Sequence, residues 1–84
     1  MNRVRLFAAA AEAAGTDTVT LTTTPDGAPP TLAGLREQLA ERFGDDFTQV
    51  LQRCAVLVDG ARLADDEPVP TDATVDVLPP FAGG

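Results

Sequence analysis

The chain has 84 residues, enough for one small domain with a single hydrophobic core but not for two. Thirteen acidic residues against six arginines give a net charge of −7. Nucleic acids and anionic membranes bind basic surfaces, so we expect neither as a partner. A partner with a basic docking surface is favoured instead. With no histidine, no lysine and Cys54 as the single cysteine, the sequence excludes a Ser-His-Asp triad and a thiolate metal cluster, and we expect a second protein to supply most catalytic groups.

The N-terminal part of the sequence alternates between strand and helix patterns. Apolar and basic side chains alternate over residues 3–7, which is typical of a half-buried strand and not of a signal peptide. No apolar run is long enough for a transmembrane helix, so we expect a cytoplasmic protein. The alanine-rich segment 8–14 predicts a short helix that ends at Gly15. Residues 18–22 predict a second strand whose threonines face water.

The strongest helix pattern covers residues 32–43. Its apolar side chains recur with a spacing close to that of a helix with one buried face: Leu32, Leu35, Leu39 and Phe43. Thr31 is a favourable N-cap residue, and we expect Gly44 to end the helix in the left-handed conformation. The prolines and the glycine between 25 and 30 predict a loop before this helix.

A second, shorter helix is predicted directly after the main one. Asp46 and Gln49 resemble a capping box at its start. Its apolar face would consist of Phe47, Val50 and Leu51.

The C-terminal part of the domain predicts three more strands. Residues 55–58 form a compact apolar segment that is typical of a buried strand. The dipeptide Asp-Gly at 59–60 is a strong signal for a two-residue hairpin, so residues 61–63 should return antiparallel to that strand. An exposed acidic connection at 65–68 leads to the last strand, residues 73–78.

This order of elements predicts an α+β fold: a mixed sheet packed on one main helix, formed by residues 1–78. The first and last strands both carry paired apolar side chains, so either could be central, and periodicity leaves their pairing open. Residues 79–84 are expected to form an extended tail, because two prolines stop the last strand.

The tail reads Pro-Pro-Phe-Ala-Gly-Gly and suggests a chemistry of its own. Gly83 and Gly84 would leave the tip without side chains, so a terminal carboxylate could pass down a narrow channel in a partner protein. There it could be joined to AMP, and a sulfur nucleophile could then convert it to a thiocarboxylate. A thiocarboxylate is an anionic nucleophile at neutral pH and needs no histidine to activate it. The alternative is a frayed, glycine-rich end with no function.

Three segments resemble the ubiquitin-like sulfur-carrier family that includes MoaD and ThiS. They are residues 4–8 leading to 14–17, the helix 31–39, and the closing segment 75–84, whose Pro-Pro-Phe-Ala-Gly-Gly end is the most specific part. The resemblance implies a β-grasp fold. Within the family, the length and the Pro-Pro-aromatic tail favour the small subunit of molybdopterin synthase, which donates sulfur for the molybdenum cofactor.

The resemblance also implies a role for each residue of the tail. Gly84 would be adenylated with ATP by an activating enzyme, an adenylyltransferase related to ubiquitin-activating enzymes, and then thiocarboxylated with sulfur from a donor protein. Gly83, Ala82, Phe81 and Pro80 would form the segment held in the partner's channel. The carrier itself would bind no cofactor and no metal. The large subunit of the synthase would hold a cyclic pterin phosphate and the catalytic residues.

Three alternatives stay open at this point. Carriers for thiamine thiazole, cysteine or tRNA thiolation share the Gly-Gly end. A ubiquitin-like modifier would use the same Gly84 to form isopeptide bonds with target lysines. A plain binding module would carry an inert tail.

The aromatic residues and the cysteine have both structural and functional interpretations. Phe7, Phe43 and Phe47 fall on apolar faces, and we expect all three in the core. Phe81 would either anchor an interface or pack back onto the sheet. Cys54 would either relay sulfur as a persulfide or, as we favour, fill space as a small buried hydrophobe.

Two charged groups are similarly ambiguous. The acidic residues at 65–67 could bind a divalent cation, but with no second ligand cluster in the sequence a solvated loop is favoured. Three arginines would either steer an acidic partner or pair with Glu37 and Glu41 on the main helix: Arg36, Arg42 and Arg62.

Overall fold

The computed structural model describes residues 1–21 and 30–80, and the loop expected between 25 and 30 falls mostly outside them. The elements in chain order are β1 (Asn2–Leu6), α1 (Ala9–Ala14), β2 (Thr18–Leu21), α2 (Leu32–Phe43), α3 (Asp45–Leu51), β3 (Ala55–Val58), β4 (Ala61–Arg62) and β5 (Thr74–Leu78). This order confirms the predicted elements, with shifts of one or two residues at some of their ends. No helix among the described residues is long and apolar enough to cross a membrane.

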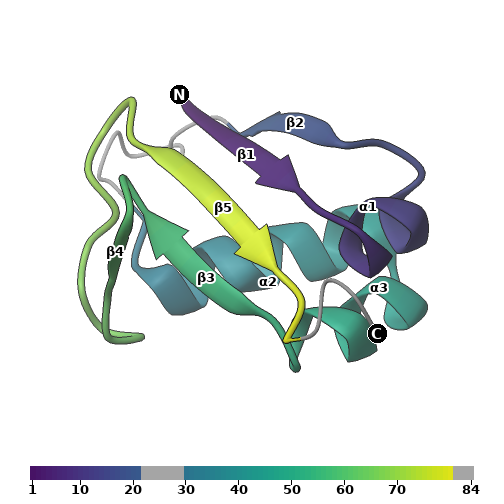
Figure 1. Ribbon diagram of the computed structural model, residues 1–84. Coiled ribbons are helices and arrows are strands. Elements are labelled where there is room, and N and C mark those ends of the chain that lie inside the picture. Colours follow the sequence, from purple (N-terminus) through teal and green to yellow (C-terminus); the bar gives the residue numbers. More distant parts are fainter. Residues whose placement is uncertain (22–29, 81–84) are drawn as a thin grey trace.

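The strands form one mixed sheet in the order β2-β1-β5-β3-β4 (Figure 1). β1 and β5 run parallel, and the other neighbouring pairs are antiparallel. The pairing that the sequence left open is therefore resolved: β5 is the central strand and β1 is its parallel neighbour. Because parallel neighbours need a crossover, the chain between them carries α2 across one face of the sheet.

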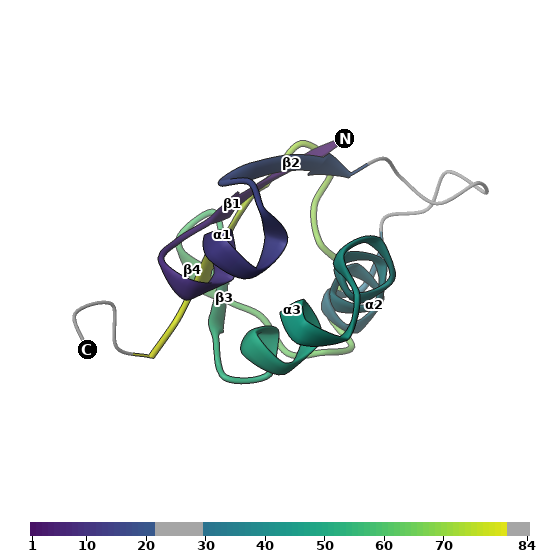
Figure 2. The same ribbon diagram turned by 90° about the vertical axis from the view of Figure 1, so that its right-hand side faces the viewer.

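The core lies between the sheet and α2, which covers one face of it (Figures 1 and 2). Val4, Val75 and Val58 lie side by side across β1, β5 and β3 on the covered face, and each is buried. Leu35 and Leu39 of α2 are completely buried against this face. The opposite face of the sheet, the outer face, has no helix packed on it (Figure 1).

Both ends of α2 are set by the flanking residues. The Thr31 hydroxyl accepts a hydrogen bond from the Gly34 N–H at 3.1 Å, which confirms the predicted N-cap. Gly44 ends the helix with φ 90° and ψ −170°, a conformation that favours glycine but is not the left-handed helical one we expected. The reason is that Gly44 also serves as the N-cap of α3 and must turn the chain into the next helix at once.

The predicted capping box of Asp46 and Gln49 is wrong. The N-cap of α3 is Gly44, two residues before Asp46, and no side chain caps its first turn. Instead, the Thr48 hydroxyl donates a hydrogen bond to the Gly44 carbonyl at 2.8 Å. The apolar face is as predicted, since Phe47 and Leu51 are buried and Val50 packs against the core.

One of the three expected core aromatics is not in the core. Phe47 is completely buried, and Phe43 packs on it with ring centroids 5.0 Å apart. Phe7 is 38% exposed, because β1 ends at Leu6 and alternation places the next side chain on the outer face. Its ring lies 5.9 Å from the guanidinium of Arg5, which is on the same face.

The segment between β4 and β5 is tied to the start of α2. The Leu32 N–H donates to the Glu67 carbonyl and the Ala33 N–H to the Asp65 carbonyl, both at 3.0 Å. These carbonyls satisfy N–H groups that the first turn of a helix leaves unpaired. The acidic side chains stay exposed, and Arg36 lies 3.9 Å from Asp65 rather than pairing with its helix neighbours. No group of three or more acidic or thiol ligands that could hold a metal occurs in residues 1–21 or 30–80.

The hairpin at 59–60 is confirmed by its backbone. Asp59 and Gly60 have φ values of 49° and 83°, as expected for the tight turn that Asp-Gly favours. β4 is shorter than predicted, ending at Arg62, and both of its residues are exposed.

Candidate functional site

The tail begins at the end of the central strand. Leu78 is the last residue of β5, and Pro79 and Pro80, which we call the tail root, follow directly. Pro79 is half-buried and Pro80 is exposed. The other predicted site residues, Phe81, Ala82, Gly83 and Gly84, lie outside the described residues. Of the predicted tail, the structure therefore describes only its root and the surroundings of that root.

The strand that carries the tail is held on both sides. Val77 is completely buried and is paired with Leu6 of β1 and Val56 of β3. The Phe7 N–H adds a hydrogen bond to the Val77 carbonyl at 3.3 Å, beyond the end of β1. The tail root is thus attached to the most enclosed strand of the sheet, and such strands are the last to open in native fluctuations.

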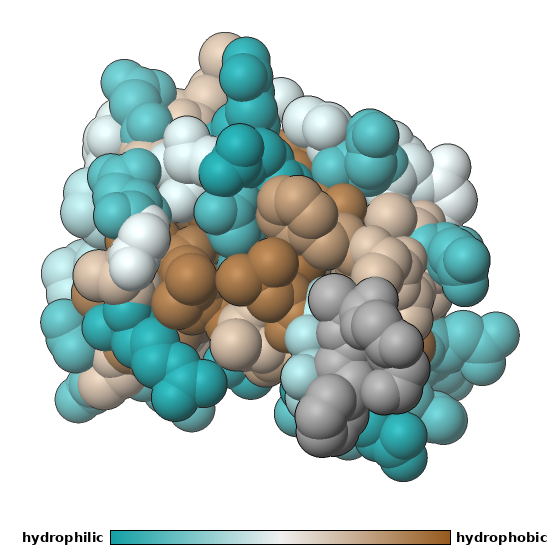
Figure 3. Space-filling view, in the orientation of Figure 1, coloured by the Kyte–Doolittle hydropathy of each residue, from teal (hydrophilic) through white to brown (hydrophobic). Residues whose placement is uncertain are grey.

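An apolar patch lies on the outer face beside the tail root. Phe7, Ala55, Leu57 and Leu78 form it, and we call it the outer apolar patch; Figure 3 shows it as the brown area on the face turned to the viewer. Ala55 and Leu78 are direct cross-strand partners, and Phe7 follows β1 next to them. Phe7 is exposed and the other three are half-buried, and apolar side chains that reach the surface together are a mark of contact surfaces.

An ion pair lies within this face. Arg5 donates two hydrogen bonds to Asp76, from Nε at 2.6 Å and from a terminal nitrogen at 2.8 Å. The hydrogen bond with Asp76, and then the charge of that carboxylate, raise the pKa of Arg5 above its ordinary value. The strand residues of the outer face also include Arg3 and Arg62, so three arginines oppose one aspartate there, although the whole chain is strongly acidic.

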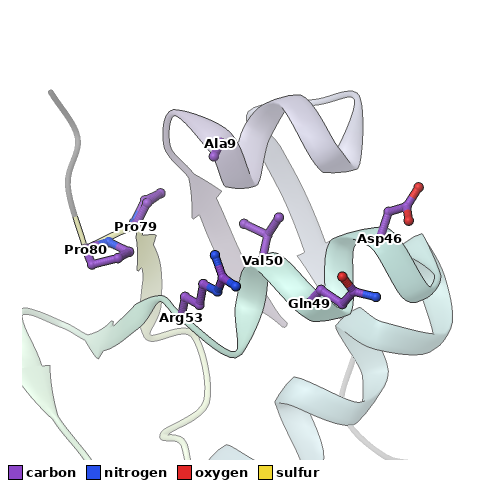
Figure 4. A pocket seen from close by; sticks show the side chains of 7 residues that line it. All are labelled: Ala9, Asp46, Gln49, Val50, Arg53, Pro79 and Pro80. Atoms are coloured by element: carbon purple, nitrogen blue, oxygen red, sulfur yellow. The ribbon is translucent and has the colours of Figure 1, made fainter. Parts of the chain in front are cut away.

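A hollow of about 360 Å³ lies on the other side of the tail root (Figure 4). Its lining comes from the start of α1, from one side of α3 and the turn just after it, and from the tail root: Ala9, Asp46, Gln49, Val50, Arg53, Pro79 and Pro80. We call it the tail-root hollow. Its residues lie far apart in the sequence, so no local pattern could have predicted it.

A turn with an unusual backbone separates the patch from the hollow. Ala8, between Phe7 and Ala9, has φ 50° and ψ −123°, and the Ala10 N–H donates to the Phe7 carbonyl at 3.0 Å. These angles are those of the first central residue of a type II′ turn, where glycine is the usual residue. Strain of this kind costs about 1–3 kcal/mol and tends to persist at functional sites.

Cys54 is buried at the junction of α3 and β3, as the structural interpretation predicted. Its Sγ donates a hydrogen bond to the Val50 carbonyl at 3.2 Å, and the residue is 8% exposed. Burial raises the pKa of the Cys54 thiol, against a smaller opposing effect of the charge on Arg36. A neutral, enclosed thiol is a poor sulfur acceptor, so the geometry favours a packing role over a persulfide relay.

Sequence reasoning missed three features of this region. The exposure of Phe7 had a signal, since the alternation that puts Arg3 and Arg5 outside also puts Phe7 outside. Arg53 and the backbone of Ala8 had none, because neither belongs to a periodic pattern or a motif.

Comparisons with known proteins agree with this geometry. The profile of the ThiS family matches residues 4–84. No curated protein matches the chain. SAMP1 from Haloferax volcanii is a similar solved structure, with 25% identity, a TM-score of 0.76 and coverage of 99% of this chain and 98% of that one.

Two further solved structures share the fold. One is a second structure of the same H. volcanii protein, small archaeal modifier protein 1, with 24% identity, a TM-score of 0.74 and coverage of 95% and 97% of the two chains. The other is a Pyrococcus furiosus protein provisionally named molybdopterin converting factor, subunit 1, with 20% identity, a TM-score of 0.81 and coverage of 95% and 97%. The β-grasp fold that the sequence resemblance implied is therefore confirmed.

Proposed function

The chain belongs to the ThiS family, and from this we propose that it is a sulfur carrier whose working group is the carboxylate of Gly84. The observation that supports the proposal is the reach of the family match, which runs through the whole Pro-Pro-Phe-Ala-Gly-Gly segment. The structure adds that the root of this segment follows the central strand and lies beside the partly exposed outer apolar patch.

The proposed chemistry begins with activation. A carboxylate oxygen of Gly84 attacks the α-phosphorus of ATP in the active site of an activating enzyme, and pyrophosphate leaves. A sulfur nucleophile from a donor protein then attacks the carbonyl carbon of the acyl-adenylate, and AMP leaves. When the nucleophile is a persulfide of the donor, a second thiol of the donor cleaves the S–S bond of the resulting acyl disulfide. This leaves a disulfide on the donor and a thiocarboxylate, anionic at neutral pH, at the end of the chain.

The residues before Gly84 bring its carboxylate into the active site of the partner. Gly83 and Ala82 add almost no width, and the prolines of the tail root limit the directions that the tail can take. Phe81 offers an aromatic ring that a channel in the partner can grip. We propose that the activating enzyme docks on the outer apolar patch, which leaves the tail free to extend into its active site.

We further propose molybdopterin synthesis, in the cytoplasm where ATP is available, as the pathway. The chain would then be the small subunit, and a large subunit would hold the cyclic pterin phosphate. Two successive thiocarboxylates would be needed to supply both sulfurs of the dithiolene. The Pro-Pro-Phe tail supports this branch over thiazole, cysteine or tRNA thiolation.

Reconstitution tests both levels of the proposal. The carrier is incubated with its activating enzyme, ATP and a sulfur donor, and we expect ATP-dependent formation of the thiocarboxylate. Adding the large subunit and the cyclic pterin should then consume it and release dithiolene product. If the thiocarboxylate forms but is not consumed, the chain is a sulfur carrier for another pathway. If no thiocarboxylate forms, the chain is not a sulfur carrier.

A second candidate function is protein modification, which is favoured by the two structures of one modifier protein among the similar structures. The chain has no lysine, so it could not form chains through its own lysine side chains. Incubation with activating enzyme, ATP and cell lysate would show stable higher-mass conjugates for a modifier and none for a pure carrier.

A further inference from the structure

The tail-root hollow is the concave feature next to the segment that delivers Gly84. Its volume of about 360 Å³ falls in the range of sites that hold small groups. Ala9, Val50 and Pro79 supply apolar walls from three separate parts of the chain (Figure 4). A side chain from another protein that entered this hollow would therefore touch the tail root and the body of the domain at once.

Its charged groups have no partner within the part of the chain that the structure describes. Arg53 is exposed, and no ion pair of Arg53 or Asp46 occurs in residues 1–21 and 30–80. They are seven residues apart in the sequence, with Asp46 in the first turn of α3 and Arg53 two residues beyond its end, and Figure 4 shows them at opposite ends of the lining. The guanidinium of Arg53 lies at the end near the prolines, so a carboxylate entering there would meet a cation on an otherwise acidic protein.

The prolines limit how a partner can hold the tail root. Neither Pro79 nor Pro80 has a backbone N–H, so a partner cannot pair with this stretch as a full β-strand. Contacts at the root must come mainly from side-chain packing, and the hollow is the place where the described structure offers room for it. It is also close to the outer apolar patch, because Phe7 and Ala9 are separated only by the strained Ala8.

We propose that the tail-root hollow receives a segment of the activating enzyme in which an apolar side chain lies beside a carboxylate that pairs with Arg53. This deepens the proposed function, on which it rests. The enzyme would hold the domain on both sides of the tail root, by the outer apolar patch and by the hollow. Binding at the hollow would raise the affinity for the carrier without touching Gly84.

Steady-state kinetics of pyrophosphate release with the full-length carrier test this proposal. Arg53→Glu should raise the KM for the carrier about tenfold and leave kcat unchanged, because the lost contact serves binding and not the reacting carboxylate. Arg53→Lys should stay close to wild type. Ala9→Gln, which fills the hollow without changing the charge, should also raise KM.

Arg42→Glu is the matched control, because it makes the same charge change in a hollow between α2 and β2. Its KM should stay near wild type, and thermal unfolding should show that all variants fold. If Arg53→Glu and Ala9→Gln both keep the wild-type KM while the wild-type carrier is adenylated, the hollow is not a contact and the inference is wrong. If the wild-type carrier is not adenylated at all, the proposed function has failed first.

Discussion

The start of α2 and the tail root differ in how far their groups are paired within the chain. At the start of α2, the Thr31 hydroxyl and the carbonyls of Asp65 and Glu67 pair with the open N–H groups of the helix. The Glu67 carboxylate also accepts a hydrogen bond from the Ala64 N–H at 2.9 Å. At the tail root, Phe7 is exposed, Arg53 has no ion pair among the described residues, and the backbone of Ala8 is strained. The backbone N–H groups of the first region are paired within the chain, whereas the second region offers side chains to a partner.

The largest expected effect is a loss of thiocarboxylation, with no loss of stability, when the end of the tail is changed. Gly83→Val adds a branched side chain next to the reacting carboxylate, and we expect thiocarboxylation to fall more than about 100-fold, as small misplacements in active sites can cost. Adding one residue after Gly84 should abolish it. Gly83→Ala should lie between wild type and valine. All three should keep the wild-type melting temperature, and a lowered melting temperature would contradict the separation of the two regions.

A pair of substitutions compares the core with the tail root directly. Leu35→Ala, in the completely buried face of α2, should lower the free energy of unfolding by about 3 kcal/mol, measured by urea denaturation. Phe7→Ala should lower it by less than about 1 kcal/mol, since the ring is exposed, but should raise the KM of activation. Equal losses of stability in the two variants would show that Phe7 belongs to the core after all.

At Ala8 we expect a smaller change, a gain rather than a loss in the free energy of unfolding. Glycine is the usual residue for its backbone angles, so Ala8→Gly should raise the free energy of unfolding by about 1 kcal/mol. The gain is limited because glycine also adds freedom to the unfolded chain. Ala11→Gly, within α1, is the matched control and should destabilise the domain.

The smallest effect concerns Cys54 and pH. Because its pKa is raised in the folded state, the folded protein holds the thiol proton more tightly than the unfolded one. Stability from this source is complete below the ordinary thiol pKa and is lost as the pH rises through the raised value. Melting temperatures of wild type and Cys54→Ala should therefore converge as the pH rises above about 9, and a constant difference would contradict the shift.

Local patterns predicted the elements well because each depends on neighbours in the sequence. Residues close together in the sequence are enough to recognise the stripe of leucines in α2, the Thr31 cap and the Asp-Gly turn. The parallel pairing of β1 with β5 could not be predicted in this way, since it joins residues about seventy positions apart.

Buried polar residues are the second limit of sequence reasoning. Asn2 is 2% exposed, and its side-chain amide donates to the carbonyls of Pro70 and Ala73 at 2.9 and 3.0 Å. Nothing near Asn2 in the sequence indicates these distant acceptors. The candidate site divides in the same way: the tail residues form a contiguous motif, whereas the outer apolar patch and the tail-root hollow exist only once the chain is folded.

Tandem mass spectrometry of the protein purified from its own cells tests the central claim most directly. It identifies the last residue of the natural chain and shows whether that residue has exchanged an oxygen for sulfur. We expect a fraction of molecules to carry this exchange at the carboxyl group of Gly84 and nowhere else. A natural chain that continues past Gly84, or sulfur found only on Cys54, would contradict it.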